Sequence, residues 1–199
     1  MIEQGYENLI LASASPRRKT LLKELGLKFE VIPADIDESF QEDETALDYV
    51  RRLAFEKANS LAQEHPDKII VSADTIVVLH NEILGKPIDK EDAFRILKTL
   101  SNNYHQVITS FAILSIKKNI KVLEHEITDV HFRELSDEDI WEYIDTGSPM
   151  DKAGAYGIQD ISAYLVDKID GCYHNVMGFP VAHFAKKWME IPSKQIHPC

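Results

Sequence analysis

The chain has little of what marks a secreted or membrane protein. Its 199 residues include only two cysteines, Cys172 and Cys199, which provide neither a disulfide framework nor a CxxC metal motif and fit a reducing compartment. No apolar run approaches the ~20 residues that cross a bilayer, and the N-terminus has no signal-peptide pattern. We therefore expect a cytoplasmic protein with no membrane partner.

Positive charge is also scarce, since 22 lysines and arginines stand against 33 aspartates and glutamates, a formal net charge of −11. Such a chain repels long polyanions, so we expect no nucleic-acid partner, whereas a small phosphorylated ligand stays open. The eight histidines form no HExxH or i,i+4 pair, and no GxxxxGK[ST], GxGxxG or GxSxG motif occurs. These absences argue against a zinc site and the commonest NTPase, dinucleotide and serine-hydrolase sites.

Strand-like and helix-like segments alternate along the whole chain, without an internal repeat or a linker, which predicts an α/β fold with a mixed central sheet. Strands are predicted at 9–12, 29–32, 68–79, 105–116, 122–132 and 163–169, and helices at 16–25, 45–64, 91–100, 136–145 and from 180 onward. At this length we expect a single domain over residues 1–199, either undivided or split into two lobes by a cleft.

The most informative stretch joins the first strand directly to a helix, and it reads Ser13-Ala-Ser-Pro-Arg-Arg18. Ser15 is a good N-cap and Pro16 suits the first helical position. The first turn then offers unpaired N–H groups and the positive end of the dipole, while Arg17 and Arg18 add forked donors that match phosphate oxygens. This pattern predicts a phosphate site. A capped surface helix with solvated arginines is the alternative.

Asp74 interrupts the β-branched run at 69–78. A carboxylate in such surroundings loses much of its hydration energy unless it is paired, bound to a metal or placed at the edge of a cleft. The alternative is a solvent-facing aspartate on an edge strand. Lys86 follows in the rigid turn Leu84-Gly-Lys-Pro87, where it is either a positioned cation or an ordinary loop lysine.

Several charged residues upstream admit two interpretations. The cluster Asp35-Ile-Asp-Glu38 offers hard oxygen ligands for a divalent metal, or it is simply a solvated acidic stretch. Lys57 could bring an ammonium toward a cleft together with its neighbour Glu56. Arg52 and Glu56 could equally form an ordinary i,i+4 surface pair.

A recognition loop is predicted at 147–160, which is rich in glycine and unusually polar. Gln159 stands out because its amide can donate to one atom and accept from the next, the complement of the O4 acceptor and N3–H donor of uracil or thymine. A glutamine that caps a turn is the alternative.

Five motifs in chain order then form a recognisable pattern, namely Ser13-Ala-Ser-Pro-Arg-Arg18, Ser72-Ala-Asp-Thr75, Ile83-Leu-Gly-Lys-Pro87, Asp151-Lys-Ala-Gly-Ala-Tyr-Gly-Ile-Gln159 and Asn175-Val-Met-Gly-Phe-Pro180. Together they resemble the Maf family of nucleoside triphosphate pyrophosphatases over about residues 9–182. The resemblance implies cleavage between the α and β phosphates, a divalent cation (Mg²⁺ or Mn²⁺) and a homodimer. It also implies an elongated mixed sheet with flanking helices and two lobes around an active-site cleft, similar to the inosine triphosphatase group.

The same resemblance implies residue roles. Asp74 matches the proton acceptor, while Arg17, Thr75 and Gln159 match the positions that set base specificity. Polar positions lining the cleft are matched by Ser13, Arg18, Glu38, Lys57, Lys86 and Lys152. We assign catalysis to Asp74 with Lys57 and Lys86, metal binding to Glu38 and Asp74, and substrate binding to Ser13, Arg17, Arg18, Thr75, Lys152 and Gln159.

Thr75 and Gln159 look like the dTTP/UTP branch of the family, because the branch that prefers methylated guanine nucleotides carries Gln and Glu at those positions. Modified pyrimidine nucleotides are a further expected substrate. One departure is Asn81, where the family commonly has glycine; asparagine tolerates the same left-handed turn. Two other functions stay open, a nucleotide-binding regulator of cell division acting through a protein partner, and a phosphatase or kinase-like enzyme acting on a terminal phosphate.

Overall fold

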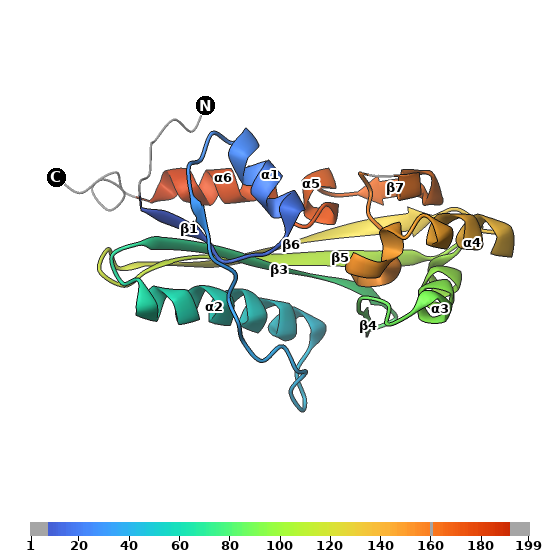
Figure 1. The fold of residues 1–199 in the computed structure, drawn as a ribbon, viewed down its shortest axis with the longest axis horizontal. Helices are drawn as coiled ribbons and strands as arrows, with labels where there is room; N and C mark the ends of the chain where they lie inside the picture. Colours follow the sequence, from blue (N-terminus) through green and yellow to red (C-terminus); the bar gives the residue numbers. More distant parts are fainter. Residues whose placement is uncertain (1–7, 160, 192–199) are drawn as a thin grey trace. The chain divides into compact units, whose positions relative to one another are not determined.

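The computed structural model describes residues 8–159 and 161–191 (Figure 1). Its strands are β1 (Leu9–Leu11), β2 (Glu30–Val31), β3 (Ile69–Leu79), β4 (Glu82–Leu84), β5 (Tyr104–Ser115), β6 (Ile120–Phe132) and β7 (Val166–Asp170). Its α-helices are α1 (Pro16–Glu24), α2 (Ala46–Glu64), α3 (Lys90–Leu100), α4 (Asp137–Asp145), α5 (Tyr173–Val176) and α6 (Val181–Glu190). Short 3₁₀ helices are η1 (Ser148–Asp151), η2 (Ala153–Ala155) and η3 (Ile161–Leu165).

The strands pair into a mixed sheet, as the sequence predicts. Within the described residues the sheet has seven strands in the order β2-β1-β3-β5-β6-β7, with β4 paired to β3. Strand β1 is parallel to both β2 and β3, whereas β3 with β4 and β6 with β7 are antiparallel. The expected α/β class, a mixed central sheet with flanking helices, is therefore confirmed.

The chain forms two compact units. The first holds the described parts of Met1–Asp74, Thr109–Glu126 and Gly178–Cys199, and the second holds those of Thr75–Ile108 and Ile127–Met177. In the first unit, alternate side chains of a strand face different helices. On β5, Phe111 packs against Phe184 of α6, with ring centroids 5.6 Å apart, whereas Ala112 joins Ala58 and Leu61 of α2. Figure 1 shows α2 on one side of these strands and α1 and α6 on the other.

Helix α1 begins and ends where the sequence predicts. The Ser15 hydroxyl accepts from the Arg18 N–H, and Pro16 occupies the first helical position. At the other end Gly26 has φ 81°, and the N–H groups of Gly26 and Leu27 donate to the carbonyls of Lys23 and Leu22. These two bonds are the Schellman pattern, which fixes the exit of the helix.

In the second unit, α4 carries a complete capping box between Ser136 and Asp139. Strands β3 and β4 are joined by His80 and Asn81, with φ of 49° and 68°, so asparagine does supply the left-handed turn geometry. The predicted strand at 163–169 is wrong at its start, because η3 occupies its first residues and β7 begins at Val166. Strand β4 and helix α5 were not predicted. Among the described residues, no helix is both long and apolar enough to span a bilayer.

Candidate active site

Asp74 lies on β3, which has β1 on one side and β5 on the other and is therefore not an edge strand. Asp74 comes after Val71, the last residue of β3 that pairs with β1, and before Val77, the first that pairs with β4, and it is 9% exposed. Its Oδ1 accepts a hydrogen bond from Lys57 Nζ at 2.7 Å. Ser72, two residues earlier on the same face of β3, donates to the Ala54 carbonyl of α2. Asp74 therefore faces helix α2 and is offset by a lysine from the middle of that helix.

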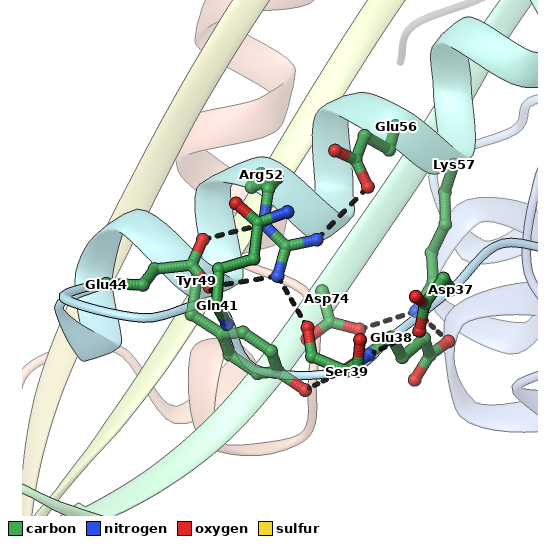
Figure 2. A network of polar contacts seen from close by, with 10 residues as sticks. All are labelled: Asp37, Glu38, Ser39, Gln41, Glu44, Tyr49, Arg52, Glu56, Lys57 and Asp74. Carbon is green, nitrogen blue, oxygen red and sulfur yellow. Dashed lines mark hydrogen bonds and ion pairs between the residues drawn. The ribbon is translucent and has the colours of Figure 1, made fainter.

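Glu38 shares the same ammonium group. Its Oε1 lies 2.7 Å from Lys57 Nζ, so one cation sits against two carboxylates from different parts of the chain (Figure 2). The side chains of Lys57 and Asp74 are 12% and 13% exposed, and that of Glu38 is 56% exposed. This geometry resolves the two alternatives for the helix, because Lys57 faces the carboxylates while Glu56 pairs with Arg52 at 3.2 Å.

Arg18 braces the same region from α1. Its Nη1 donates to the Ala73 carbonyl at 2.7 Å and to the Ser13 hydroxyl at 3.3 Å, and its Nε donates to the Gly178 carbonyl at 2.9 Å. Burial lowers the pKa of Arg18, an effect that the negative charge of Asp74 opposes and that of neighbouring Arg17 reinforces. Arg18 is thus a fixed, partly buried cation whose charge acts on Asp74.

These contacts bring together five of the predicted residues, all within the first unit: Ser13, Arg18, Glu38, Lys57 and Asp74. Arg17 lies beside them in the first turn of α1 and is half-buried. Two cations, Arg18 and Lys57, therefore lie close to the carboxylates of Glu38 and Asp74. Such a cluster can hold a polyanion and accept a proton within one small volume.

The two carboxylates also suit a divalent cation. Magnesium is usually held by one or two carboxylates, with substrate phosphates and waters completing its octahedron. The carboxylates of Glu38 and Asp74 converge on one point, which Lys57 Nζ occupies. Their oxygen atoms are the type of ligand that magnesium prefers. Over the described part of the chain, no group of three or more His, Cys, Asp or Glu side chains could hold a metal ion by itself. The protein alone would accordingly hold such an ion weakly, with waters as further ligands, and the nucleotide would tighten its binding.

The other four predicted residues belong to the second unit. Thr75 is half-buried on β3, Lys86 is exposed after β4, and Gln159 is exposed beyond η2. Lys152 is 8% exposed, and its Nζ donates to the Ser148 hydroxyl at 3.1 Å and to Asp151 at 2.9 Å. Because adjacent strand residues point to opposite faces, Thr75 does not share the α2-facing side of Asp74.

The segment that carries Lys152 and Gln159 is anchored at glycine 154. The Gly154 N–H donates to the Gly85 carbonyl at 2.9 Å, which ties the segment to the turn that bears Lys86. Gly154 has φ 68°, and a Cβ there would lie 2.8 Å from Cγ2 of Val77. Only glycine allows this approach, so the packing against β3 fixes the segment beside the strand that carries Thr75.

A buried hydrogen bond also holds Tyr156, which lies in the same segment. His105 Nε2 and the Tyr156 hydroxyl lie 2.7 Å apart, and both residues are at most 5% exposed. Burial lowers the pKa of His105 to about 3 and raises the pKa of Tyr156. His105 is therefore neutral at physiological pH, and the pair joins β5 to the segment that ends in Gln159.

Two residues hold Glu38 in place: Tyr49, which the sequence did not single out, and Arg52, which it indicated only as a partner of Glu56. Tyr49 and Arg52 of α2 bond to the backbone of the 37–44 segment. Their position on the helix, three residues apart, was a usable signal, because i and i+3 side chains share a helix face. His105 gave no signal, since only its packing shows that it is buried.

With this geometry in place, comparison with known proteins decides the family. The family described as "Maf-like protein" matches residues 8–190, nearly the whole chain. The chain belongs to the Maf family.

Curated Maf relatives cover almost all of this chain. One named "dTTP/UTP pyrophosphatase" from Clostridioides difficile (strain 630) is 46% identical over 92% of this chain and 96% of its own length. Another of the same name, from Alkaliphilus metalliredigens (strain QYMF), is 47% identical over 96% of this chain and 97% of its own. A third, from Aquifex aeolicus (strain VF5), is 46% identical over 92% and 95%.

Two solved structures are more distantly similar. A nucleoside-triphosphatase, dITP/XTP pyrophosphatase, from Mycobacterium abscessus has a TM-score of 0.41 at 13% identity over 64% of this chain and 75% of that chain. Protein VC0702 from Vibrio cholerae has a TM-score of 0.43 at 10% identity over 94% and 99%. At these scores the two likenesses say nothing about substrate or mechanism.

Proposed function

We propose that this Maf protein is a nucleoside triphosphate pyrophosphatase that hydrolyses dTTP and UTP, and modified pyrimidine nucleotides, to the monophosphate and pyrophosphate. The observation that carries the proposal is the buried carboxylate of Asp74, bonded to Lys57 at 2.7 Å in the company of Glu38 and Arg18. The names of relatives at 46–47% identity support the same activity. They also favour an enzyme over a regulator of cell division.

Charge neutralisation is the first task of the proposed site. A nucleoside triphosphate carries several negative charges, and Arg18, Lys57 and the amino end of α1 supply positive charge that offsets them. Arg18 is braced by the carbonyls of Ala73 and Gly178, so its guanidinium is held before substrate arrives. Preorganised charge of this kind needs no rearrangement at the moment of reaction. We also propose Lys86 as a catalytic cation and Lys152 as a substrate-binding cation.

Proton transfer is the second task, and we assign it to Asp74. A carboxylate held in a strand can accept the proton of a water that attacks the α phosphorus in line with the pyrophosphate leaving group. Lys57 orients that carboxylate by donating a hydrogen bond to Oδ1. A magnesium or manganese ion, held by Glu38 and Asp74, would polarise the phosphate oxygens and acidify the water.

Base selection is the third task, and we assign it to Arg17, Thr75 and Gln159. The Gln159 amide presents one donor and one acceptor, which match N3–H and O4 of thymine or uracil. A pocket built from such groups rejects a mismatched ring because its own polar atoms are left unpaired, by as much as ~10⁴-fold. Ser13 would support the phosphate end by fixing Arg18, to which its hydroxyl is bonded.

We further infer that the enzyme works in the cytoplasm, where free nucleotides are found, and that it acts as a homodimer. Equilibrium sedimentation over a range of protein concentrations tests the second point. A single species of 22.7 kDa at all concentrations would contradict it.

Product analysis tests the proposed reaction. Purified protein is incubated with magnesium and a panel of nucleoside triphosphates, and pyrophosphate and orthophosphate are measured separately. Pyrophosphate in equal amount to monophosphate, with dTTP and UTP fastest, is the expected result. Orthophosphate alone would indicate attack on the terminal phosphate. No product with any triphosphate would favour the regulator.

A further inference from the structure

The position of Glu38 depends on a segment without regular secondary structure, residues 37–44, which precedes helix α2 (Figure 2). The Glu38 side chain is 56% exposed, so no surrounding core keeps it at Lys57. An exposed carboxylate on a flexible backbone loses conformational entropy whenever it is fixed, and a surface ion pair alone offsets little of that loss. Something else must hold this backbone.

Two side chains of α2 do so by bonding directly to the backbone around Glu38. The Tyr49 hydroxyl donates to the Glu38 carbonyl at 2.8 Å. Arg52 Nη2 donates to the carbonyl of the next residue, Ser39, at 2.9 Å. Two adjacent carbonyls are thus fixed from one helix face, and a backbone fixed at both points leaves the Glu38 side chain only its own rotamers.

Arg52 also fixes the far end of the same segment. Its Nε and Nη2 bond to the two carboxylate oxygens of Glu44 at 2.7 and 2.9 Å, a bidentate pair. Its Nη1 bonds to Glu56, one turn further along α2, at 3.2 Å. Glu56 thereby orients the guanidinium, so one arginine joins both ends of the segment to the helix.

Aromatic contacts close the cluster. The Arg52 guanidinium lies 5.5 Å from the centre of the Tyr49 ring. The ring of Phe40 also packs against Tyr49, with ring centroids 5.3 Å apart. Hydrogen bonds to Arg52 hold the pKa of Glu44 below its usual range, so that carboxylate stays ionised well into the acid range. The clamp is therefore intact across the pH range in which a nucleotide enzyme works.

We propose that Tyr49 and Arg52 are positioning residues that clamp the 37–44 segment onto α2 and so hold the Glu38 carboxylate beside Lys57 and Asp74. The proposal rests on the proposed function, in which Glu38 and Asp74 hold the divalent cation. Both clamp residues act through the backbone of the segment, to whose carbonyls they donate. Their effect is to keep one ligand in place, which lowers the cost of assembling the metal site.

The test compares Arg52→Met with Arg51→Met. Arg51 is the adjacent arginine on the same helix, but it points to His125, with Nη1 and Nδ1 3.0 Å apart, so it is a matched control for loss of charge. Manganese binding to the full protein without nucleotide is measured by the loss of the free-ion electron paramagnetic resonance signal. Pyrophosphate release from dTTP is then measured against magnesium concentration.

For Arg52→Met we expect about a 10-fold weaker manganese affinity and a matching rise in the magnesium concentration for half-maximal activity, because supporting partners of metal ligands typically have effects of that size. The rate at saturating magnesium should stay within a few-fold of wild type. Tyr49→Phe, which removes only the hydroxyl, should also weaken manganese affinity, but by less than Arg52→Met does. Arg51→Met should leave manganese affinity at the wild-type value.

Arg52→Lys separates a clamp from a charge. Lysine keeps the positive charge but cannot bond in two directions at once as the forked guanidinium does. A clamp therefore predicts that Arg52→Lys resembles Arg52→Met, with faster amide hydrogen exchange in residues 37–44 of both variants. Wild-type manganese affinity in both would overturn the proposal, as would equal weakening in Arg51→Met.

The two proposals fail in different ways. If the wild-type protein releases no pyrophosphate from any triphosphate, the proposed function is wrong whatever the variants do. If the wild type is active and binds manganese while Arg52→Met binds it equally well, the clamp is wrong and the function stands. Lower thermal stability of Arg52→Met with unchanged manganese affinity would also reject the clamp, because it would show a structural role only.

Discussion

A carboxylate inside a strand is stable only when a partner offsets its lost hydration, and at Asp74 the ammonium of Lys57 does so. We predict that Asp74→Asn lowers the turnover of dTTP by ~10²-fold or more, because general-base loss has an effect of this size. Asparagine keeps the shape and a hydrogen-bond acceptor for Lys57, so the fold should persist. Turnover is measured by pyrophosphate release, and circular dichroism checks the fold. Turnover within a few-fold of wild type would remove Asp74 from the reaction.

Gln159 is the residue at which base choice is best tested, since its side chain is exposed and contributes little to the core. We predict that Gln159→Glu weakens dTTP and UTP hydrolysis by at least ~10-fold, because a carboxylate cannot donate to O4 of the base. The melting temperature should change little. The measurement pairs kcat/KM for each triphosphate with thermal unfolding. Parallel losses of activity and stability would indicate a structural glutamine.

At the scale of single elements, the segment from η2 to Gln159 is placed by backbone fit rather than by charge. We predict that Gly154→Ala destabilises the protein by about 1–3 kcal/mol, because its Cβ would enter the space of Val77 and its φ is 68°. Discrimination between dTTP and dGTP should fall with it, since Gln159 moves with the segment. Urea unfolding gives the stability and kcat/KM ratios give the discrimination.

Gly147→Ala is the control for that prediction. Gly147 also has a positive φ of 74°, but a Cβ there would meet nothing within 4 Å. Both variants strain the backbone, but only Gly154→Ala crowds Val77. The difference between their unfolding free energies therefore measures the effect of that crowding. Equal stability and equal base discrimination in both variants would mean that the contact with Val77 does not place the segment.

The His105–Tyr156 pair couples the same segment to β5, and its burial has a consequence for pH. The folded-state pKa of His105 is about 3, below the ordinary value of 6.5. Between these two pH values the imidazole is protonated in the unfolded chain and neutral in the folded protein. Stability from this group is complete above pH 6.5 and is lost as the pH falls toward 3. Between pH 7 and 4.5 the free energy of unfolding falls by about 2.5 kcal/mol through this group.

We therefore predict that His105→Gln, whose amide can still bond to the Tyr156 hydroxyl, loses about 2.5 kcal/mol less unfolding free energy than wild type between pH 7 and 4.5. Urea unfolding at both pH values measures the difference. His174→Gln, at an exposed histidine, should keep the wild-type difference. If the unfolding free energy of His105→Gln depends on pH as that of wild type does, the His105 side chain is not fully buried in solution.

Sequence alone predicted most of the elements, because capping residues, periodicity and β-branched runs are local signals. Ser15 and Pro16 placed the start of α1, and the β-branched run placed β3 with Asp74 inside it. Sequence could not give the contacts made by Lys57, because a long-range ion pair depends on how α2 packs. For the same reason the residue pattern left Glu38 undecided and showed Arg52 only as a partner of Glu56. The start of β7 was missed because η3 has strand-like residues that tertiary packing turns into a 3₁₀ helix.

For the molecule as a whole, the proposed ligand must overcome a net charge of −11 by local contacts. A ligand that binds only the folded state stabilises it by about 2.7 kcal/mol at 100 times its dissociation constant. We predict that magnesium with an α,β-methylene analogue of dTTP, which cannot be cleaved, raises the melting temperature by about 5–10 °C for a chain of this size. The dGTP analogue at equal concentration should raise it by less than half as much. Equal shifts of the melting temperature with the two analogues would show that the protein does not distinguish the bases. If the dTTP analogue raises the melting temperature only when magnesium is present, the cation is needed for binding itself.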